Sequence, residues 1–180
     1  MTNLSAPPVA APAAPVTPSR LASKAPARPA LSAVTVGTAG SVAALVALVA
    51  IGVGLHQTVL IPPLAASAAL VFGAPALPLS QPRSVIGGQL ISALVGFLVL
   101  AVGGSSMWAA GVAGGLALGA MMLARTPHSP AAATAVIVVL TRPHPVTFLA
   151  LLALATVVLV LVGIVAGRSG RTARYPSYWW

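Results

Sequence analysis

The sequence predicts an all-α, polytopic membrane protein, and three features lead to that fold class. The chain of 180 residues is 58% hydrophobic, with a mean hydropathy of +1.03. It has nine lysine and arginine residues and no aspartate or glutamate, whereas a water-soluble surface needs charges of both signs. Its apolar residues also form long blocks, most of them close to the ~20 helical residues that cross a bilayer.

Four of these blocks predict ordinary spanning helices. They cover residues 31–55, 85–102, 108–124 and 146–167. In the two central blocks a small residue recurs at every fourth position: Gly88, Ser92 and Gly96, then Gly111, Gly115 and Gly119. Such stripes predict that two helix backbones approach closely, with a substrate-lining face as the alternative.

Two shorter stretches predict half-helices that begin at proline. PPLAASAALV, from residue 62, and SPAAATAVIV, from residue 129, align on Pro63 and Pro130 and place Ser67 opposite Thr134. Proline in a first helical turn lacks only an N–H that would be unpaired anyway. Paired discontinuous helices with their positive dipole ends at membrane depth are typical of transporters with internal repeats, so we expect such a repeat here.

The number of crossings depends on these half-helices. If they are re-entrant, the chain crosses four times, and Arg83, Arg125 and Arg142 all lie outside. If each crosses together with its connection, there are six crossings and inverted halves, and only Arg142 lies outside. The positive-inside rule favours the second arrangement, in which part of the crossing at residues 127–141 is non-helical.

The ends of the chain differ from its centre. Residues 1–30 are rich in proline and alanine and predict a disordered tail, and residues 31–167 form one transmembrane domain. Residues 168–180 carry three arginines followed by aromatic residues, a pattern of membrane-interface anchors. We expect both ends to be cytoplasmic and the protein to lie in the plasma membrane or the inner membrane of the cell.

Composition also excludes several kinds of site. Without cysteine there is no disulfide or thiolate, and without carboxylates there is no catalytic triad, paired-acid hydrolysis or ordinary magnesium site. Three scattered histidines do not predict a metal site, so we expect no metal, no cofactor and no enzymatic activity. The basic residues are spread singly, which argues against nucleic acid as a partner.

The candidate site residues fit an anion. A buried anion needs positive charge or hydrogen-bond donors, and Arg83 and Arg125 each lie beside a proline-rich break. The alternative for both is a topology determinant. His128 precedes the half-helix that begins at Pro130, where it is either a donor to the anion or a capping and packing residue.

Three uncharged residues complete the candidate site. Ser67 and Thr134 are either hydroxyl donors to substrate or bonded back to carbonyls of their own helices. Gln89 is an amide inside an apolar helix, which predicts either a pore-lining residue or an interhelical hydrogen bond.

These residues lie in motifs that resemble the HPP family, small integral membrane proteins named for a His-Pro-Pro motif. The matching motifs are FGAP at residues 72–75, QPR at 81–83, VIGG at 85–88, SA at 92–93 and HxPAxATA at 128–135. The resemblance covers roughly residues 31–167 and implies a four-helix membrane protein. The chain departs from the family pattern at Ser129, in place of proline, and at Ala132, in place of the common glycine, and both changes concern the site.

Some members of the resembled family, in chloroplasts and cyanobacteria, transport nitrite, and many have no assigned cargo. We therefore expect a permease for a small inorganic anion, with nitrite suggested by the resemblance alone. The alternative is a non-transporting membrane protein that assembles with or regulates a partner. Because a 17.7 kDa chain has few helices to line a path through the lipid bilayer, we also expect a homo-oligomer.

Overall fold

The computed structural model describes residue 25 and residues 27–179, and this part of the chain is helical, with no strand. Most of the predicted N-terminal tail lies outside the described residues. The helices are α1 (Leu31–Leu55), α2 (Pro62–Gly73), α3 (Gly88–Gly103), α4 (Met107–Leu123), α5 (Ser129–Thr141) and α6 (Pro145–Gly167). A 3-10 turn η1 (Pro78–Ser80) and a π-helical turn η2 (Arg83–Gly87) precede α3. The all-α expectation is confirmed.

Local chemistry accounts for the helix boundaries. Prolines occupy the first turns of α2, α5 and α6, where their missing N–H removes no helical bond. Ser106 caps α4, its side chain accepting from the backbone N–H of Ala109 at 3.1 Å. Both predicted half-helices are present as α2 and α5, each extending two or three residues beyond its predicted end.

Within the described residues, three helices are long and apolar enough to cross a membrane: α1, the continuous helix Arg83–Gly103, and α6. The expectation of four spanning helices is not confirmed. Helix α4 has 17 residues, which is about 25 Å of helix against a hydrocarbon core of ~30 Å. Helices α2 and α5 are shorter still, as expected of half-helices.

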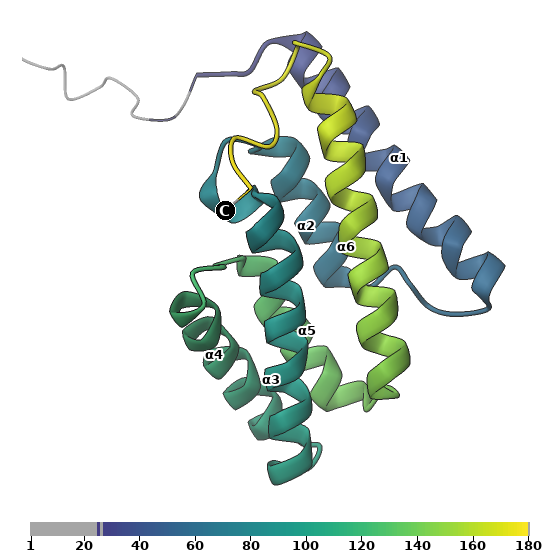
Figure 1. Ribbon diagram of the computed structural model, residues 1–180, viewed down its shortest axis with the longest axis vertical. Helices are drawn as coiled ribbons and strands as arrows, with labels where there is room; N and C mark the ends of the chain where they lie inside the picture. The colour runs from purple at the N-terminus through teal and green to yellow at the C-terminus, as the bar shows by residue number, and fades with distance from the viewer. Residues whose placement is uncertain (1–24, 26, 180) are drawn as a thin grey trace, which may run out of the picture.

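The six helices pack as two groups of three. Helices α1, α2 and α6 contact one another, and so do α3, α4 and α5 (Figure 1). The groups meet where α2 packs on α5 and α3 packs on α6. At the second contact the ring of Phe97 meets that of Phe148 edge to face, with 5.9 Å between centroids. Each group therefore takes helices from both halves of the sequence.

The two predicted stripes of small residues have different surroundings. The stripe on α3 faces α5: a Cβ on Gly96 would lie 2.8 Å from the carbonyl oxygen of Ala135. This close approach confirms tight helix packing at that stripe. The stripe on α4 is exposed instead, and a Cβ on Gly111, Gly115 or Gly119 would meet nothing within 4 Å. Within the described chain, α4 packs through the opposite face, with Ala110, Ala113 and Ala117.

The C-terminal segment folds back onto the helices. The ring of Tyr175 is buried, and its atoms lie close to Gly163 and Gly167 of α6, where any side chain would collide with it. Trp179 is 53% exposed. The expected role of this segment as an interface anchor stays a prediction.

Candidate functional site

A buried polar cluster lies where the starts of α2 and α5 meet, and His128 is at its centre. The imidazole is 1% exposed. Its Nδ1 atom lies 2.8 Å from the carbonyl oxygen of Leu79, which can only accept, so Nδ1 carries a proton. Its Nε2 atom lies 2.7 Å from the hydroxyl oxygen of Ser67. His128 holds the N-cap position of α5, but its side chain makes no capping bond.

Three further side chains extend this cluster. The amide nitrogen of Gln89 donates to the Ser67 oxygen at 3.0 Å, and the hydroxyl of Thr134 donates to the amide oxygen of Gln89 at 2.5 Å. The Ser67 hydroxyl also lies 2.9 Å from the carbonyl oxygen of Pro63, one turn earlier. All three side chains are fully buried. The chain His128–Ser67–Gln89–Thr134, called here the polar relay, thus joins α2, α3 and α5.

The polar relay holds the two helix groups together by directional bonds. Its components come from α2 in one group and from α3 and α5 in the other. Ser92 adds a further bond between α3 and α5, donating to the carbonyl oxygen of Ala131. Interhelical hydrogen bonds in membrane proteins contribute about 0.6–2 kcal/mol each. The main effect of the polar relay is therefore to fix how the two helix groups are aligned, and its contribution to the free energy of folding is modest.

A cationic cleft lies beside the polar relay. Its volume is about 630 Å³, and its lining residues are Pro78, Arg83, Ser84, Met122, Arg125, Pro127 and Tyr178. Pro127 is the neighbour of His128 in the chain, and Pro78 is the neighbour of Leu79, whose carbonyl holds the imidazole. The cleft and the relay are therefore adjacent on both segments that position His128.

The backbone places Arg125 in this cleft through an unusual conformation. Helix α4 ends just before it, and Arg125 has a left-handed φ of 59°. Its N–H bonds to the Met122 carbonyl at 3.0 Å, and the N–H of Thr126 bonds to Met121 at 2.9 Å, which closes the last turn. The left-handed residue turns the chain out of α4 and into the connection that carries His128.

The starts of α2 and α5 offer an anion few free backbone N–H groups. Pro62, Pro63 and Pro130 have no N–H, and the amides of Leu64 and Ala65 both bond to the carbonyl of Ile61. The positive ends of the helix dipoles remain. The arginines of the cationic cleft supply side-chain hydrogen-bond donors for an anion.

The C-terminal segment closes one side of this region. The N–H of Ser177 donates to the side-chain oxygen of Gln81 at 2.8 Å, and the Gln81 amide nitrogen donates to the carbonyls of Pro75 and Leu77. Tyr178 reaches the cationic cleft. Tyr175 lies in this segment, outside the spanning helices. Burial raises the pKa of its phenol.

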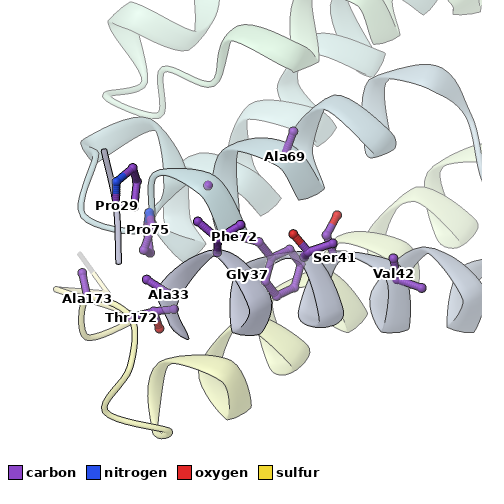
Figure 2. A pocket seen from close by; sticks show the side chains of 13 residues that line it. Pro29, Ala33, Gly37, Ser41, Val42, Ala69, Phe72, Pro75, Thr172 and Ala173 are labelled. Atoms are coloured by element: carbon purple, nitrogen blue, oxygen red, sulfur yellow. The ribbon is translucent and has the colours of Figure 1, made fainter. Parts of the chain in front are cut away.

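A second hollow is apolar and contains none of the relay residues. It has a volume of about 540 Å³ and is lined mainly by α1, the end of α2 and the C-terminal segment. Figure 2 shows the Phe72 ring beside Gly37 and Ser41 in this groove. Its lining residues include no lysine, arginine or histidine, so it presents no charged side chain to a ligand.

The structure brings together the predicted site residues in two adjacent places. Ser67, Gln89, Thr134 and His128 form the polar relay, and Pro130 begins the helix that carries Thr134. Arg83 and Arg125 share the cleft. Gln89 makes the interhelical bonds that were one of its two predicted roles, and Ser67 bonds back to its own helix while also reaching His128.

Sequence reasoning missed two contributors. Gln81 belongs to the QPR motif, which could have drawn attention to it, and its side chain connects the η1 region to the C-terminal segment. Tyr178 is 51 residues beyond Pro127, the nearest other residue of the cleft in sequence (178 − 127 = 51), so no local pattern indicates it.

Comparisons with known proteins show to which family this chain belongs. Residues 26–176 match the family model described as HPP, transmembrane region. Two transmembrane proteins of Dictyostelium discoideum are each 32% identical to the chain, over 69% and 67% of its length. The matches cover 47% and 42% of those relatives, so the chain spans less than half of the curated relatives it matches. No solved structure matches the chain significantly. The chain is an integral, multi-pass membrane protein and belongs to the HPP family.

Proposed function

We propose that this protein is a permease for a small inorganic anion, bound in the cationic cleft beside the polar relay. The observation that carries the proposal is that Arg83 and Arg125 line one cleft, in a chain without aspartate or glutamate. Two guanidinium groups attract an anion and repel cations. The cleft also presents the hydroxyl groups of Ser84 and Tyr178 as uncharged donors.

Nitrite is the first substrate to test, because the resemblance to nitrite-transporting family members suggests it. Its planar oxygens suit the forked donors of arginine. Neither a cofactor nor a catalytic step is needed for this function.

We further propose that the two halves of the chain form an inverted repeat of three helices each, with α1, α2 and α3 corresponding to α4, α5 and α6. The packing supports this assignment: α1 contacts α2 and α6, as α4 contacts α5 and α3. The contact of α2 with α6 likewise corresponds to that of α5 with α3, and the contacts of α2 with α5 and of α3 with α6 join corresponding helices, as a two-fold axis between the halves allows. In such transporters the substrate site lies where the repeats meet.

The positions of the arginines support six crossings over four. Arg83 and Arg125 share a cleft with Tyr178 of the C-terminal segment, while Arg142 ends α5 at the opposite end from His128. Six crossings put the first two arginines and the C-terminus on one side and Arg142 on the other. With the positive-inside rule, the shared side is cytoplasmic, and both termini lie there. A plasma membrane or inner membrane fits this orientation.

The test is uptake of nitrite into proteoliposomes that contain the purified full chain, with nitrate and chloride as comparators. Measurements at two pH values, each corrected for passive entry into protein-free liposomes, show whether transport depends on pH. Entry of nitrite well above that into protein-free liposomes, and above that of chloride, supports the permease. Entry equal to that into protein-free liposomes at both pH values would contradict it.

The second candidate is a non-transporting membrane protein that assembles with a partner, and the exposed stripe on α4 favours it. Gly111, Gly115 and Gly119 form a surface that another helix could approach closely. A second copy of the chain is the simplest occupant, and a homo-oligomer is compatible with either function. Crosslinking in native membranes tests this: products of twice the mass that disappear in Gly115→Leu support the dimer, and monomer alone contradicts it.

A further inference from the structure

We propose that the apolar groove beside α1 is a binding site for one anionic phospholipid of the surrounding bilayer. The apolar groove is the hollow of about 540 Å³ shown in Figure 2, which includes Gly37 and Phe72. It shares no lining residue with the cationic cleft, so the proposal is independent of anion transport. An acyl chain of the lipid lies in the groove, and the phosphate lies at the arginines beside one end.

The groove follows α1 from its start. Figure 2 shows Ala33 near one end of the groove and Val42 at the other. Val42 is nine residues after Ala33 (42 − 33), which is about 14 Å along a helix. The hydrocarbon of one leaflet is about as deep, at half of a core of ~30 Å. The groove is therefore long enough for the acyl chain of a lipid in the leaflet at which α1 begins.

The walls of the groove come from three parts of the fold. Helix α1 forms one wall, Ala69 and Phe72 of α2 contribute to another, and Thr172 and Ala173 of the C-terminal segment lie at one end. The ring of Tyr175 is buried against α6 and holds this segment in place. The groove is thus a preformed concave site, unlike the outer face of a single helix, and apolar concave sites are typical of ligand binding.

Three arginines lie beside the end of the groove that the C-terminal segment closes. Each is the chain neighbour of a lining residue, and the pairs are Arg28–Pro29, Arg171–Thr172 and Arg174–Ala173. All three arginines are exposed, and the sequence has no aspartate or glutamate. The lining itself carries no charged side chain. A ligand with an apolar chain and an anionic head is complementary to both parts of this site.

The charge of the headgroup decides which phospholipid fits. Guanidinium groups bind phosphate oxygens through paired N–H donors, and a headgroup of net negative charge gains most from three of them. A choline or ethanolamine headgroup instead brings a cation close to the same arginines. By the positive-inside rule, the end of the molecule with these arginines faces the cytoplasm. Basic pockets between helices on that side are typical sites for anionic headgroups.

A lipid in the groove contacts α1, α2 and the C-terminal segment together. Of the 25 residues of α1, four are buried, so this helix packs weakly on the rest of the described chain. Because the groove exists only in the folded protein, a lipid that binds there stabilises the fold by mass action. The bound lipid therefore links α1 to its neighbours and should raise the melting temperature.

The experiment titrates the purified, delipidated full chain in detergent with dioleoyl phosphatidylglycerol and counts bound lipids by native mass spectrometry. Dioleoyl phosphatidylcholine has the same acyl chains and tests the headgroup, and glycerol 3-phosphate tests whether a phosphate without acyl chains is sufficient. We expect one saturable phosphatidylglycerol site, with an affinity roughly tenfold or more above that for phosphatidylcholine, and no binding of glycerol 3-phosphate. Thermal unfolding of the same samples should show a higher melting temperature with phosphatidylglycerol alone.

Variants locate the site. Arg171→Gln and Arg174→Gln are each expected to weaken phosphatidylglycerol binding about fivefold and to leave phosphatidylcholine binding unchanged. Arg142→Gln is the matched control, because Arg142 is exposed but ends α5 and is not a neighbour of the groove. Ala69→Phe places a ring in the groove and should weaken binding of both lipids. Ala66→Phe is its control, since Ala66 is exposed on the same helix and does not line the groove.

Three results would overturn the proposal. Equal affinities for the two lipids, or equal effects of Arg174→Gln and Arg142→Gln, would show that these arginines do not select an anionic headgroup. Phosphatidylglycerol binding that persists unchanged in Ala69→Phe would place the lipid elsewhere. A species of twice the mass that is lost in Ala69→Phe, without selective lipid binding, would show that a second copy of the chain occupies the groove. None of these results affects the permease, which is tested by anion flux.

Discussion

Gly88 and His128 lie so close together that the position of the imidazole depends on the absence of a side chain at residue 88. A Cβ on Gly88 would lie 2.7 Å from the Cβ of His128 and 2.8 Å from the carbonyl oxygen of Thr126. Both neighbours belong to the connection between α4 and α5, and neither can rotate away as a long side chain would. The glycine of the VIGG motif is therefore part of the framework that presents His128 to Ser67.

Gly88→Ala is expected to destabilise the protein by about 1–3 kcal/mol, because the added methyl group overpacks this contact. Thermal unfolding in detergent, followed by tryptophan fluorescence, measures the effect. Gly115→Ala is the matched control, since a Cβ there meets nothing within 4 Å and the helix is expected to tolerate it. Equal melting temperatures for the two variants would contradict the contact.

Gln89 and Thr134 are expected to be energetically coupled through the bond between the Thr134 hydroxyl and the Gln89 amide oxygen. In a double-mutant cycle of Gln89→Ala and Thr134→Val, the coupling free energy should be about 0.5–2 kcal/mol, as for other interhelical hydrogen bonds. Chemical unfolding in detergent provides the four stabilities. Thr141 is a suitable control because its hydroxyl bonds back to its own helix, and Gln89→Ala with Thr141→Val should be additive.

Arg125→Gly is expected to reduce nitrite entry roughly tenfold or more, the effect of losing one charge-assisted bond to a bound anion. Glycine adopts the left-handed φ of this residue readily, so the charge is removed without straining the backbone. Arg142→Gly is the matched control. Arg142 also has a left-handed φ, of 50°, but it does not line the cationic cleft. An equal loss of flux in both variants would show that the position of the charge is unimportant.

Tyr175 is expected to make stability fall at alkaline pH. Burial raises the pKa of its phenol, so as the pH rises above about 10 the unfolded chain loses this proton before the folded protein does. Between pH 8 and about 10 the free energy of unfolding should therefore be constant, and above that it should decrease by up to about 1.4 kcal/mol per pH unit. Unfolding measured from pH 8 to 11 tests this.

Tyr175→Phe should abolish that alkaline decrease. Its hydroxyl is buried without a hydrogen-bond partner among the described residues, so the substitution should leave stability at neutral pH unchanged or slightly higher. Tyr178→Phe is the control and should keep the decrease, because Tyr178 is 40% exposed. A decrease that survives in Tyr175→Phe would show that another group titrates.

The helices could be predicted from the sequence because their signals are local. Hydrophobic blocks and prolines in first turns fixed the ends of α1, α2 and α5 closely. Helix α4 has the 17 residues that its apolar block predicted, but this length is short for a spanning helix, so its crossing of the membrane is not confirmed. The alignment of Pro63 with Pro130 also identified Ser67 and Thr134 as equivalent positions in two half-helices.

The contacts between these residues could not be predicted, because they depend on how distant helices approach. Ser67 and His128 are 61 positions apart, and nothing near either residue indicates the other. The two stripes of small residues could not be told apart from the sequence either. They have the same spacing, but the stripe on α3 faces α5 and the stripe on α4 faces outward. The spacing of small residues shows which side of a helix they share, but which helix packs against that side depends on how the whole chain folds.

The exchange of helices between the two groups has a consequence for biosynthesis. Helices α1 and α2 emerge from the ribosome well before α6, with which both of them pack. Gln89 likewise enters the membrane before Thr134 has been synthesised. Co-translational insertion must therefore hold α3 with the amide oxygen of Gln89 unpaired until α5 has been made. Removal of α6 would leave α1 and α2 without their packing partner, and such fragments are expected to be substrates for membrane quality-control proteases.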